Sequence, residues 1–501
     1  MVLLMILLLL VVGALISGLV LWRARQSHGA GGGRPRAFAG RLTAPLLLAS
    51  ALLIAVVFVV VDAPGEDDSA GSGKSLPGIY TLHQGRIYMN IGGQGYYRVP
   101  GADAGSFGPL GGPDSQSLGK DRSAVYCGSR VIPQLRPEQV RFVSDGYVSD
   151  GRRAWYCTRP KQNASYHWWH DFTHSQSEDS PEKPRPTDYV LVPLESVNAA
   201  NLKIVVDAYA QDGVHAFYEG SVIPGADGAS LQTVKLGRGD LAGRVDDRYA
   251  RDSRRVYFQG NVVPGAGPAT FVAFRPDSDQ WDNVYGQDRA TGRFYFGATP
   301  FPAEVDGVDS RSLHLLIADR DRANHELFYG ASGIWFWDYR GEGLRRGCAN
   351  PFAGTPVMLS PGVWTDDRNA FVIRAVDEWG NGRSDRSLKA RKTQLWMLPG
   401  LPASKWTKVA DLGGGQGESR GILWRGGSQL YFAPSAGKNV FLNDALYIVS
   451  DPEGLKRDLR SAQYYVSVLR AGDIQRLDSS DSTVVCRVAS RYPSTWEFWK
   501  Q

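Results

Sequence analysis

Two long stretches near the start of the chain contain only apolar and small uncharged residues. Met1–Leu21 and Leu42–Val61 hold no charged side chain. At about 1.5 Å per residue, a helix over either stretch crosses the roughly 30 Å hydrocarbon core of a bilayer. We therefore predict, in chain order, a transmembrane helix over 1–22, a loop over 23–41, a second transmembrane helix over 42–62 and a linker over 63–76.

The loop between these helices sets the expected orientation. It carries five arginines and no acidic residue, and loops rich in Lys and Arg stay in the cytoplasm. The alternative for the first stretch is a cleaved signal peptide, which has its basic residues in front; here Arg23 and Arg25 follow the apolar run. We expect a two-pass membrane protein whose large C-terminal domain lies outside the cytoplasm.

The charge of the chain is concentrated in that loop. Its five arginines equal the formal net charge of +5, and the first 61 residues contain no acid, so the remaining charges sum to zero. A neutral C-terminal domain has no basic footprint for nucleic acid. The expected partner of the N-terminal part is therefore the lipid bilayer, and nucleic acid is not an expected partner.

After the linker the sequence consists of short β-type segments, and two of these repeat 40 residues apart. Residues 209–231 and 249–271 share a Tyr-Ala-x-Asp start, an apolar and aromatic triplet, a glycine and a Pro-Gly-Ala end. Weaker copies place an aspartate before a similar triplet, at Asp121 with 125–128, Asp150 with 155–157, Asp288 with 294–297 and Asp321 with 327–330.

Each repeat predicts a β-hairpin. The triplet Val256-Tyr257-Phe258 suits a pleated strand, Gly260-Asn261 is typical of a two-residue turn, and Val262-Val263 forms the return strand. One hairpin cannot bury its apolar face alone, so several must stack or lie radially. The recurrent aspartate predicts an Asx turn rather than a calcium loop, because each repeat supplies only one such acid.

The aspartate, the aromatic strand, the glycine and the Pro-Gly-Ala-Asp end at 224–227 resemble the DKNYW repeat family of bacterial envelope proteins. The resemblance covers roughly residues 85–330 and is firmest at 209–271. It departs from the family pattern where Lys-Asn is replaced by Gly213-Val214 and Ser253-Arg254. The resemblance implies a bacterial, membrane-anchored envelope protein, hence the inner membrane with a periplasmic domain, and it supplies no catalytic residues.

The predicted fold is an all-β repeat ectodomain, built of β-hairpin repeats in a propeller-like or meander arrangement and preceded by two transmembrane helices. The repeats are expected over 77–344. Residues 345–501 lose the motif but keep short strands separated by Gly- and Pro-rich turns, which is typical of propeller-like sheets. The acidic pairs Asp246-Asp247 and Asp366-Asp367 are expected in solvated turns.

The four cysteines all follow the linker. An even number in an oxidising compartment permits two disulfides. Cys127 and Cys157 occupy nearly matching places in successive repeats, so they are the expected pair, which leaves Cys348 and Cys486. Buried free thiols are the alternative, since cysteine is among the most buried residue types.

A Pro-, Ser- and charge-rich stretch over 159–188 predicts a long loop inserted between repeats. It holds Trp168 and Trp169, which are candidates for a partner contact. The same stretch holds three of the eight histidines, His167, His170 and His174, and these are weak candidates for a metal site. The alternative is a loop with a structural role only.

Trp335, Trp337 and Tyr339 alternate along a predicted strand and therefore share one face. An exposed aromatic face of this kind stacks on sugar rings or contacts a protein partner. The alternative is packing between sheets, where aromatic side chains are most often found.

The sequence contains no GxSxG and no P-loop, and it predicts no cofactor. We expect a non-enzymatic binding or scaffold module for an envelope protein or glycan, because repeats build extended surfaces. The alternative is an envelope hydrolase whose acidic residues converge from separate repeats.

Overall fold

The computed structural model describes residues 68–491, apart from short internal segments. Those segments are 93–94, 112–116, 145, 164, 167–186, 238–241, 275–283, 317–321, 342, 381–387, 414–418, 436–443 and 460–471. Both predicted transmembrane helices, 1–22 and 42–62, lie outside the described residues. Among the residues that are described, no helix has the length and hydropathy needed to cross a bilayer.

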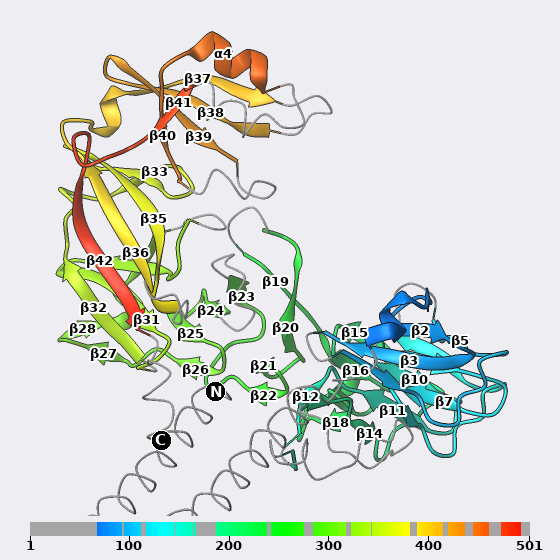
Figure 1. Cartoon of the computed structure of the whole chain (residues 1–501). Coiled ribbons are helices and arrows are strands. Elements are labelled where there is room, and N and C mark those ends of the chain that lie inside the picture. The colour runs from blue at the N-terminus through cyan, green and yellow to red at the C-terminus, as the bar shows by residue number, and fades with distance from the viewer. Residues whose placement is uncertain are drawn as a thin grey trace, which may run out of the picture.

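The described chain is almost entirely β-structure, as the sequence predicts (Figure 1). Its body is formed by nine antiparallel sheets, which we number in chain order. Sheets 1 to 7 have four strands each, and sheets 8 and 9 have five.

The N-terminal sheets have the following strands. Sheet 1 contains β1 (Lys74–Ser75), β2 (Tyr80–His83), β3 (Arg86–Ile91) and β4 (Gly95–Arg98). Sheet 2 contains β5 (Gly108–Pro109), β6 (Leu118–Lys120), β7 (Val125–Cys127) and β8 (Arg130–Val131). Sheet 3 contains β9 (Arg141–Ser144), β10 (Tyr147–Ser149), β11 (Ala154–Cys157) and β14 (Leu191–Pro193). Sheet 4 contains β15 (Lys203–Val206), β16 (Tyr209–Gln211), β17 (Ala216–Tyr218) and β18 (Ser221–Val222).

The later sheets continue in the same way. Sheet 5 contains β19 (Gln232–Lys235), β20 (Val245–Arg251), β21 (Val256–Phe258) and β22 (Asn261–Val262). Sheet 6 contains β23 (Phe271–Phe274), β24 (Tyr285–Asp288), β25 (Arg293–Phe296) and β26 (Thr299–Pro300). Sheet 7 contains β29 (His314–Leu316), β30 (Leu327–Gly330), β31 (Gly333–Asp338) and β32 (Gly343–Ala349).

The last two sheets are larger. Sheet 8 contains β33 (Val357–Ser360), β34 (Val363–Thr365), β35 (Ala370–Trp379), β36 (Leu388–Leu398) and β42 (Thr483–Arg491). Sheet 9 contains β37 (Trp406–Gly413), β38 (Ser419–Gly426), β39 (Gln429–Pro434), β40 (Tyr447–Val449) and β41 (Ile474–Arg476). Two small hairpins pair β12 (Lys161–Gln162) with β13 (Thr187–Asp188) and β27 (Glu304–Val305) with β28 (Val308–Asp309). The described helices are η1 (Asp68–Ser72), η3 (Gly228–Ser230), η4 (Ser310–Ser312), η5 (Ala403–Lys405) and α4 (Pro452–Asp458).

The repeat is a four-stranded meander rather than a single hairpin. The predicted hairpin forms the third and fourth strands, and two further strands precede it in each sheet. The turn also lies one residue earlier than predicted, at Gln259-Gly260, because Phe258 pairs with Asn261. Both turn residues have positive φ, 47° and 78°, which a two-residue turn of this hand requires.

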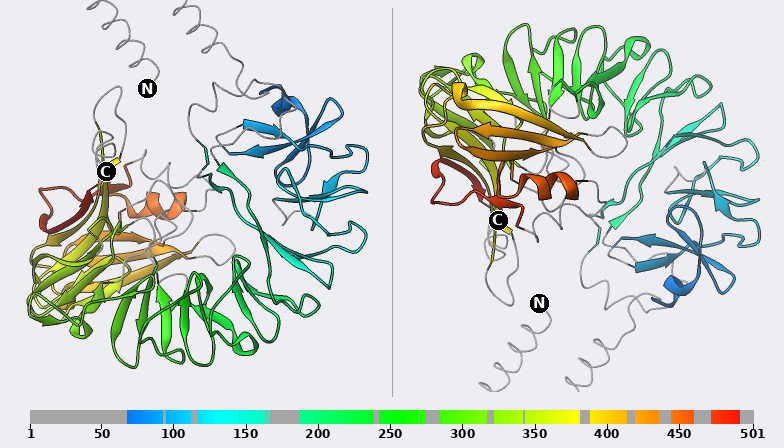
Figure 2. Two further views of the ribbon diagram at one scale, coloured as in Figure 1. Left: turned by 90° about the horizontal axis from the view of Figure 1, so that it is seen from below. Right: turned by 90° about the horizontal axis from the view of Figure 1, so that it is seen from above.

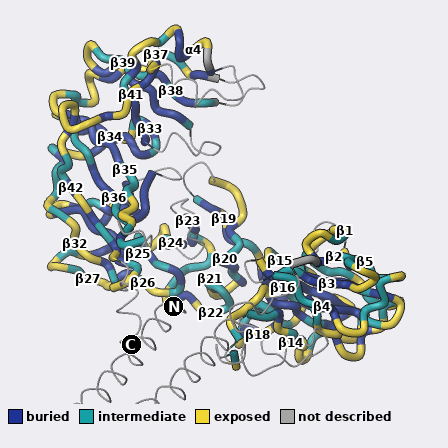
Figure 3. The backbone as a smooth tube through the Cα atoms, in the orientation of Figure 1, coloured by how far each residue is buried: buried dark blue, intermediate teal, exposed yellow. Residues whose placement is uncertain are grey.

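Neighbouring sheets pack face to face, so the apolar core is divided into layers between them. Between sheets 4 and 5, Tyr209 and Ile223 pack with Tyr257. Tyr249 of sheet 5 lies against Phe271 of sheet 6, with the ring centroids 5.0 Å apart. Buried residues follow the inner strands, and exposed ones gather in the turns and in outer strands such as β18 and β22 (Figure 3). A sheet in such a stack depends on its neighbours for stability.

Short helical segments cover the two terminal sheets. At the N-terminal end, η1 lies on sheet 1, and a Cβ on Gly71 would be 3.2 Å from the Tyr96 ring. At the other end, Leu455 and Leu459, in and just after α4, pack on Phe432 of sheet 9. Helical covers of this kind shield the apolar faces at the ends of the stack.

The sheets follow one another along an arc (Figure 2). Among the described strands, none pairs the first sheet with the last. The chain instead turns back after sheet 9, and β42 pairs with β36 in sheet 8.

Candidate functional site

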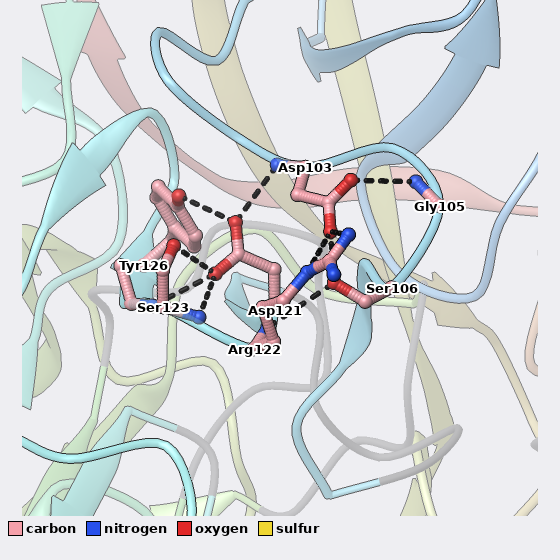
Figure 4. A network of polar contacts seen from close by, with 8 residues as sticks. Asp103, Gly105, Ser106, Asp121, Arg122, Ser123 and Tyr126 are labelled. Carbon is pink, nitrogen blue, oxygen red and sulfur yellow. Dashed lines mark hydrogen bonds and ion pairs between the residues drawn. The ribbon is translucent and has the colours of Figure 1, made fainter.

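The repeated aspartate is the centre of a hydrogen-bonded network that recurs in several sheets, and Figure 4 shows the network around Asp121. In sheet 2, Asp121 follows β6 and one of its carboxylate oxygens accepts from the backbone N–H groups of Ser123 and Ala124, both at 2.7 Å. The other oxygen accepts from the N–H of Asp103, at 2.8 Å, and from the Tyr126 hydroxyl, at 2.8 Å. We call this arrangement of turn, connector and tyrosine around one aspartate the repeat clasp.

Sheet 5 has the same clasp with different residues. Asp252 accepts from the N–H groups of Arg254 and Arg255 through one oxygen, and from the Asp227 N–H and the Tyr257 hydroxyl through the other. Burial alone raises the pKa of the Asp252 carboxyl, but these hydrogen bonds outweigh it and hold the pKa below its ordinary value. The clasp therefore contains a buried carboxylate anion at neutral pH.

Reduced forms of the clasp occur in other sheets. Asp212 of sheet 4 accepts from the N–H groups of Asn198, Val214 and His215. In sheet 6, Asp288 uses the Gly267 N–H and the Thr270 hydroxyl. The network thus joins the turn after the second strand to the connector that leads into the same sheet.

The expectation that Asp246 and Asp366 lie in solvated turns is wrong. Asp246 is 0% exposed and Asp366 is 1% exposed. Asp366 forms a clasp in sheet 8, where it accepts from the N–H groups of Ala353, Arg368 and Asn369. The repeat architecture therefore continues past residue 344, where the sequence motif is lost.

The clasp is an Asx turn extended by a connector, and its chemistry differs from that of a calcium loop. Both oxygens of Asp121 already face N–H or O–H donors. A calcium ion needs several oxygen ligands with free lone pairs close together. Within the described residues, no group of three or more His, Cys, Asp or Glu side chains could hold a metal ion.

In sheets 1, 3, 4 and 5, a buried tyrosine on the second strand donates to a backbone carbonyl of the next sheet. The Tyr209 hydroxyl of sheet 4 donates to the Arg248 carbonyl, at 3.0 Å, and accepts from the Gly260 N–H, at 3.0 Å, in sheet 5. Tyr147 of sheet 3 makes the same two bonds to Ala208 and Gly220 of sheet 4. This hydroxyl fixes the position of the hairpin turn in the neighbouring sheet.

The hairpin turn requires glycine for two reasons: its φ is positive, and the neighbouring sheet leaves no room for a Cβ. Gly260 has φ of 78°, and a Cβ at this position would lie 2.9 Å from the Tyr218 Cβ of sheet 4. Gly220 is equally close to Tyr156, with 2.7 Å to the Tyr156 Cβ. Any larger residue here would force the two sheets apart.

Both disulfides join neighbouring sheets. Cys127 of sheet 2 is bonded to Cys157 of sheet 3, and Cys348 of sheet 7 is bonded to Cys486 of sheet 8. All four cysteines are therefore paired in the structure. Because each sheet contacts mainly its neighbours, a covalent bond between sheets prevents that interface from opening.

The insertion at 159–188 lies within a repeat rather than between repeats. It interrupts the hairpin of β11 and β14 in sheet 3 and is extended by β12 and β13. Its base is braced by ion pairs to both neighbouring sheets: Lys161 with Glu219, Arg159 with Asp207, and Arg130 with Asp188. Trp168, Trp169, His167, His170 and His174 lie outside the described residues.

Trp335 and Trp337 do not form an exposed aromatic face. Their exposed fractions are 0% and 4%, and both pack between sheets 6 and 7 with Phe294 and Phe301. The opposite face of β31 is also buried, since every residue of this strand is buried. Tyr339 is partly buried against the same cluster, and its hydroxyl donates to the Asn324 carbonyl. Packing between sheets, the alternative interpretation, is the observed arrangement.

A second polar cluster is buried where sheets 7 and 8 meet. His325 is 0% exposed; its Nε2 lies 3.0 Å from the Ser490 Oγ on β42, and its Nδ1 lies 3.2 Å from the Thr393 Oγ1 on β36. Ser490 in turn donates to Asp338 of β31, at 2.9 Å. Burial lowers the pKa of His325 to about 3, although the nearby Asp338 carboxylate opposes this shift.

This cluster is not a catalytic triad. In a triad the histidine lies between the serine and the carboxylate, whereas here Ser490 lies between His325 and Asp338. The Ser490 side chain is also 0% exposed, so substrate has no access to it. Sequence reasoning missed the cluster, because Ser490 is 165 residues away from His325 and no local pattern connects them.

Comparison with known families agrees with the repeat architecture. The family model described as the DKNYY family matches residues 80–242, from β2 of sheet 1 past β19 of sheet 5. This match confirms the predicted family resemblance over that segment. The clasps at Asp252, Asp288 and Asp366 extend the same architecture beyond the matched residues. No curated protein and no solved structure matches the chain.

Proposed function

We propose that this chain is a membrane-anchored repeat protein of the bacterial cell envelope, with its sheets in the periplasm, and that it serves as a non-enzymatic binding scaffold for an envelope protein or glycan. The two apolar stretches Met1–Leu21 and Leu42–Val61 support the membrane anchor. Two disulfides between sheets support an oxidising compartment, because cytosolic thiols are kept reduced.

The braced insertion of sheet 3 carries the binding part of the proposal. Where sheets 4 and 5 turn in two residues, sheet 3 extends a hairpin whose base is tied to sheet 2 and sheet 4. A long connection that is positioned by a folded scaffold is the usual arrangement of recognition loops. The connection contains Trp168 and Trp169, and tryptophan is enriched in binding hot spots.

A crosslinking pull-down from native membranes tests this proposal, with the full chain as bait. Gln162 pairs with Thr187, so residues 163–186 can be replaced by Asn-Gly to give a short hairpin. A second variant, with Trp168→Ala and Trp169→Ala, keeps the length of the connection and tests the two side chains alone. We expect a specific protein or glycan with the native chain and a loss of recovery with both variants. Recovery that is the same with all three chains would contradict the proposal.

A further inference from the structure

The last strand of the described chain holds three sheets together. β42 follows sheet 9, pairs with β36 of sheet 8, and is bonded through Cys486 to Cys348 of sheet 7. Beyond the disulfide, its end is held by the buried cluster around His325, through Ser490. Residues 488–491 are therefore held by their pairing with β36 and by the hydrogen bonds of that cluster.

The donors and acceptors of the cluster fix the state of the imidazole. The Ser490 Oγ accepts from the Tyr339 N–H, at 3.2 Å, and donates to Asp338, so it receives the Nε2–H of His325. The Thr393 Oγ1 accepts from the N–H groups of Asn324 and His325, both at 2.9 Å. Its own proton is therefore donated to Nδ1, which must be unprotonated.

A second proton on His325 cannot be accommodated. It would turn Nδ1 into a donor that faces Thr393 Oγ1, whose lone pairs are both already occupied. The ring has no room to move, because it stacks on Tyr339 at 4.8 Å and meets Phe336 edge-on at 5.2 Å. The charged form would be buried with one donor facing another, which is strongly unfavourable.

The other charged groups around the ring belong to the elements packed against it. Asp338 of β31 pairs with Arg345 of β32, at 3.2 Å. Asp377 of β35 accepts from the Asn324 side chain, at 2.9 Å, and Arg391 of β36 lies near the ring and disfavours its protonation. Glu326, next to His325 in the chain, is also buried. The acidic groups Asp338, Asp377 and Glu326 are therefore competing sources of any response to acid.

We infer that His325 is the acid-sensitive part of a C-terminal lock, in which the neutral imidazole holds residues 488–491 of β42 on sheets 7 and 8 and protonation releases them. Cys486 keeps the rest of β42 attached through its disulfide. Release uncovers the edge of β36, where Thr393 pairs with Val488 and Ala390 with Arg491. This inference does not depend on the proposed binding function.

The direction of the pH dependence follows from the lowered pKa. The locked state binds fewer protons than the open state between the pKa of about 3 and the ordinary histidine value of about 6.5. The lock is therefore fully stable above about pH 6.5, and it weakens as the pH falls from about 6.5 to about 3. From pH 7 to pH 4 the open population rises roughly 200-fold by this linkage.

Hydrogen exchange of the full chain tests the inference, with rates corrected for the intrinsic effect of pH. For the amides of residues 488–491 we expect the corrected rate to rise by about two orders of magnitude between pH 7 and pH 4. In His325→Gln, which keeps a donor toward Ser490 but does not titrate, we expect a rise of less than about threefold over the same range. His215→Gln, in sheet 4, is the matched control and should behave like the native chain.

Two results would overturn the inference. One is an unchanged exchange rate in the native chain, and the other is an equal rise in His325→Gln, which would assign the response to Asp338, Glu326 or Asp377. If His325→Gln does not fold, nitrogen NMR of labelled histidine in the native chain decides the question. We expect a neutral Nε2–H signal for His325 that becomes charged only as residues 488–491 open. A charged ring in the closed state would contradict the lock.

Discussion

Replacing Asp252 by asparagine removes one carboxylate oxygen from the clasp of sheet 5. The remaining oxygen can still accept from the N–H groups of Arg254 and Arg255. The new amide then faces the Asp227 N–H, which loses its acceptor, while the Tyr257 hydroxyl can turn to accept. The substitution leaves one partly buried backbone donor unpaired and removes the negative charge from the other bonds.

The cost can be estimated from these bonds. A buried donor without a partner costs about 1–3 kcal/mol, and the loss of charge from two hydrogen bonds costs about 1 kcal/mol each. These terms add to about 3–5 kcal/mol. We expect Asp252→Asn to destabilise sheet 5 by about 3 kcal/mol, the low end of this range, because the Asp227 N–H is only partly buried. Since about 1.4 kcal/mol is a factor of ten, the exchange of amides in β19–β22 should accelerate roughly a hundredfold.

Hydrogen exchange resolved by peptide is the appropriate assay, because opening of one sheet in a stack is a local event. The control is Asp247→Asn on the same strand, β20, where the side chain is 35% exposed and pairs with Arg248 at 3.7 Å. Surface substitutions of this kind change stability by less than about 0.5 kcal/mol. If Asp252→Asn exchanges no faster than Asp247→Asn, the clasp does not stabilise the sheet and the reasoning fails.

The remaining predictions concern the contacts between sheets. Tyr209→Phe leaves the Gly260 N–H without an acceptor and should cost about 1–3 kcal/mol, measured as faster exchange in β21 and β22. Trp335→Ala should cost about 3–5 kcal/mol in denaturant titrations, since the side chain is fully buried, whereas an exposed binding residue would cost little. Replacing Cys127 and Cys157 together by alanine should cost about 2–5 kcal/mol in thermal unfolding, and an unchanged transition would mean that the interface does not need the bond.

The repeat unit is the part of the fold that the sequence predicts best. The spacing from Tyr209 to Asp212 and on to the triplet at 216–218 identifies the second and third strands and the turn between them. The first strands share no such signature: β15 reads Lys-Ile-Val-Val, β19 reads Gln-Thr-Val-Lys and β23 reads Phe-Val-Ala-Phe. The sequence therefore predicts only a hairpin where the structure has a four-stranded meander.

The clasp of sheet 8 shows why a motif can disappear while its geometry remains. Asp366 keeps its turn N–H donors and its connector donor, but no tyrosine hydroxyl bonds to it among the hydrogen bonds described for this residue. Backbone donors require no particular side chain, so the arrangement survives without the sequence pattern. The same holds for the acidic pair at Asp366-Asp367. A sequence does not show which backbone N–H groups will bond to an aspartate, so the pair is predicted to be exposed to solvent.

The buried cluster and the aromatic strand could not be derived from local patterns. His325 is held by Thr393 and Ser490, which are 68 and 165 residues away in the chain. Trp335 and Trp337 alternate as an exposed face would, and only the sheet packed on each side of β31 decides that they are buried. Such assignments depend on which sheets become neighbours.

Trapping of thiols in intact cells tests the central claim, that this is a sheet stack outside the cytoplasm held by two disulfides. Free thiols are alkylated with a mass tag under acid quench, before and after reduction, and the shift of the chain is compared. We expect no tag before reduction and tags on all four cysteines after it. Tagging of Cys127, Cys157, Cys348 or Cys486 before reduction in most of the chains would contradict it.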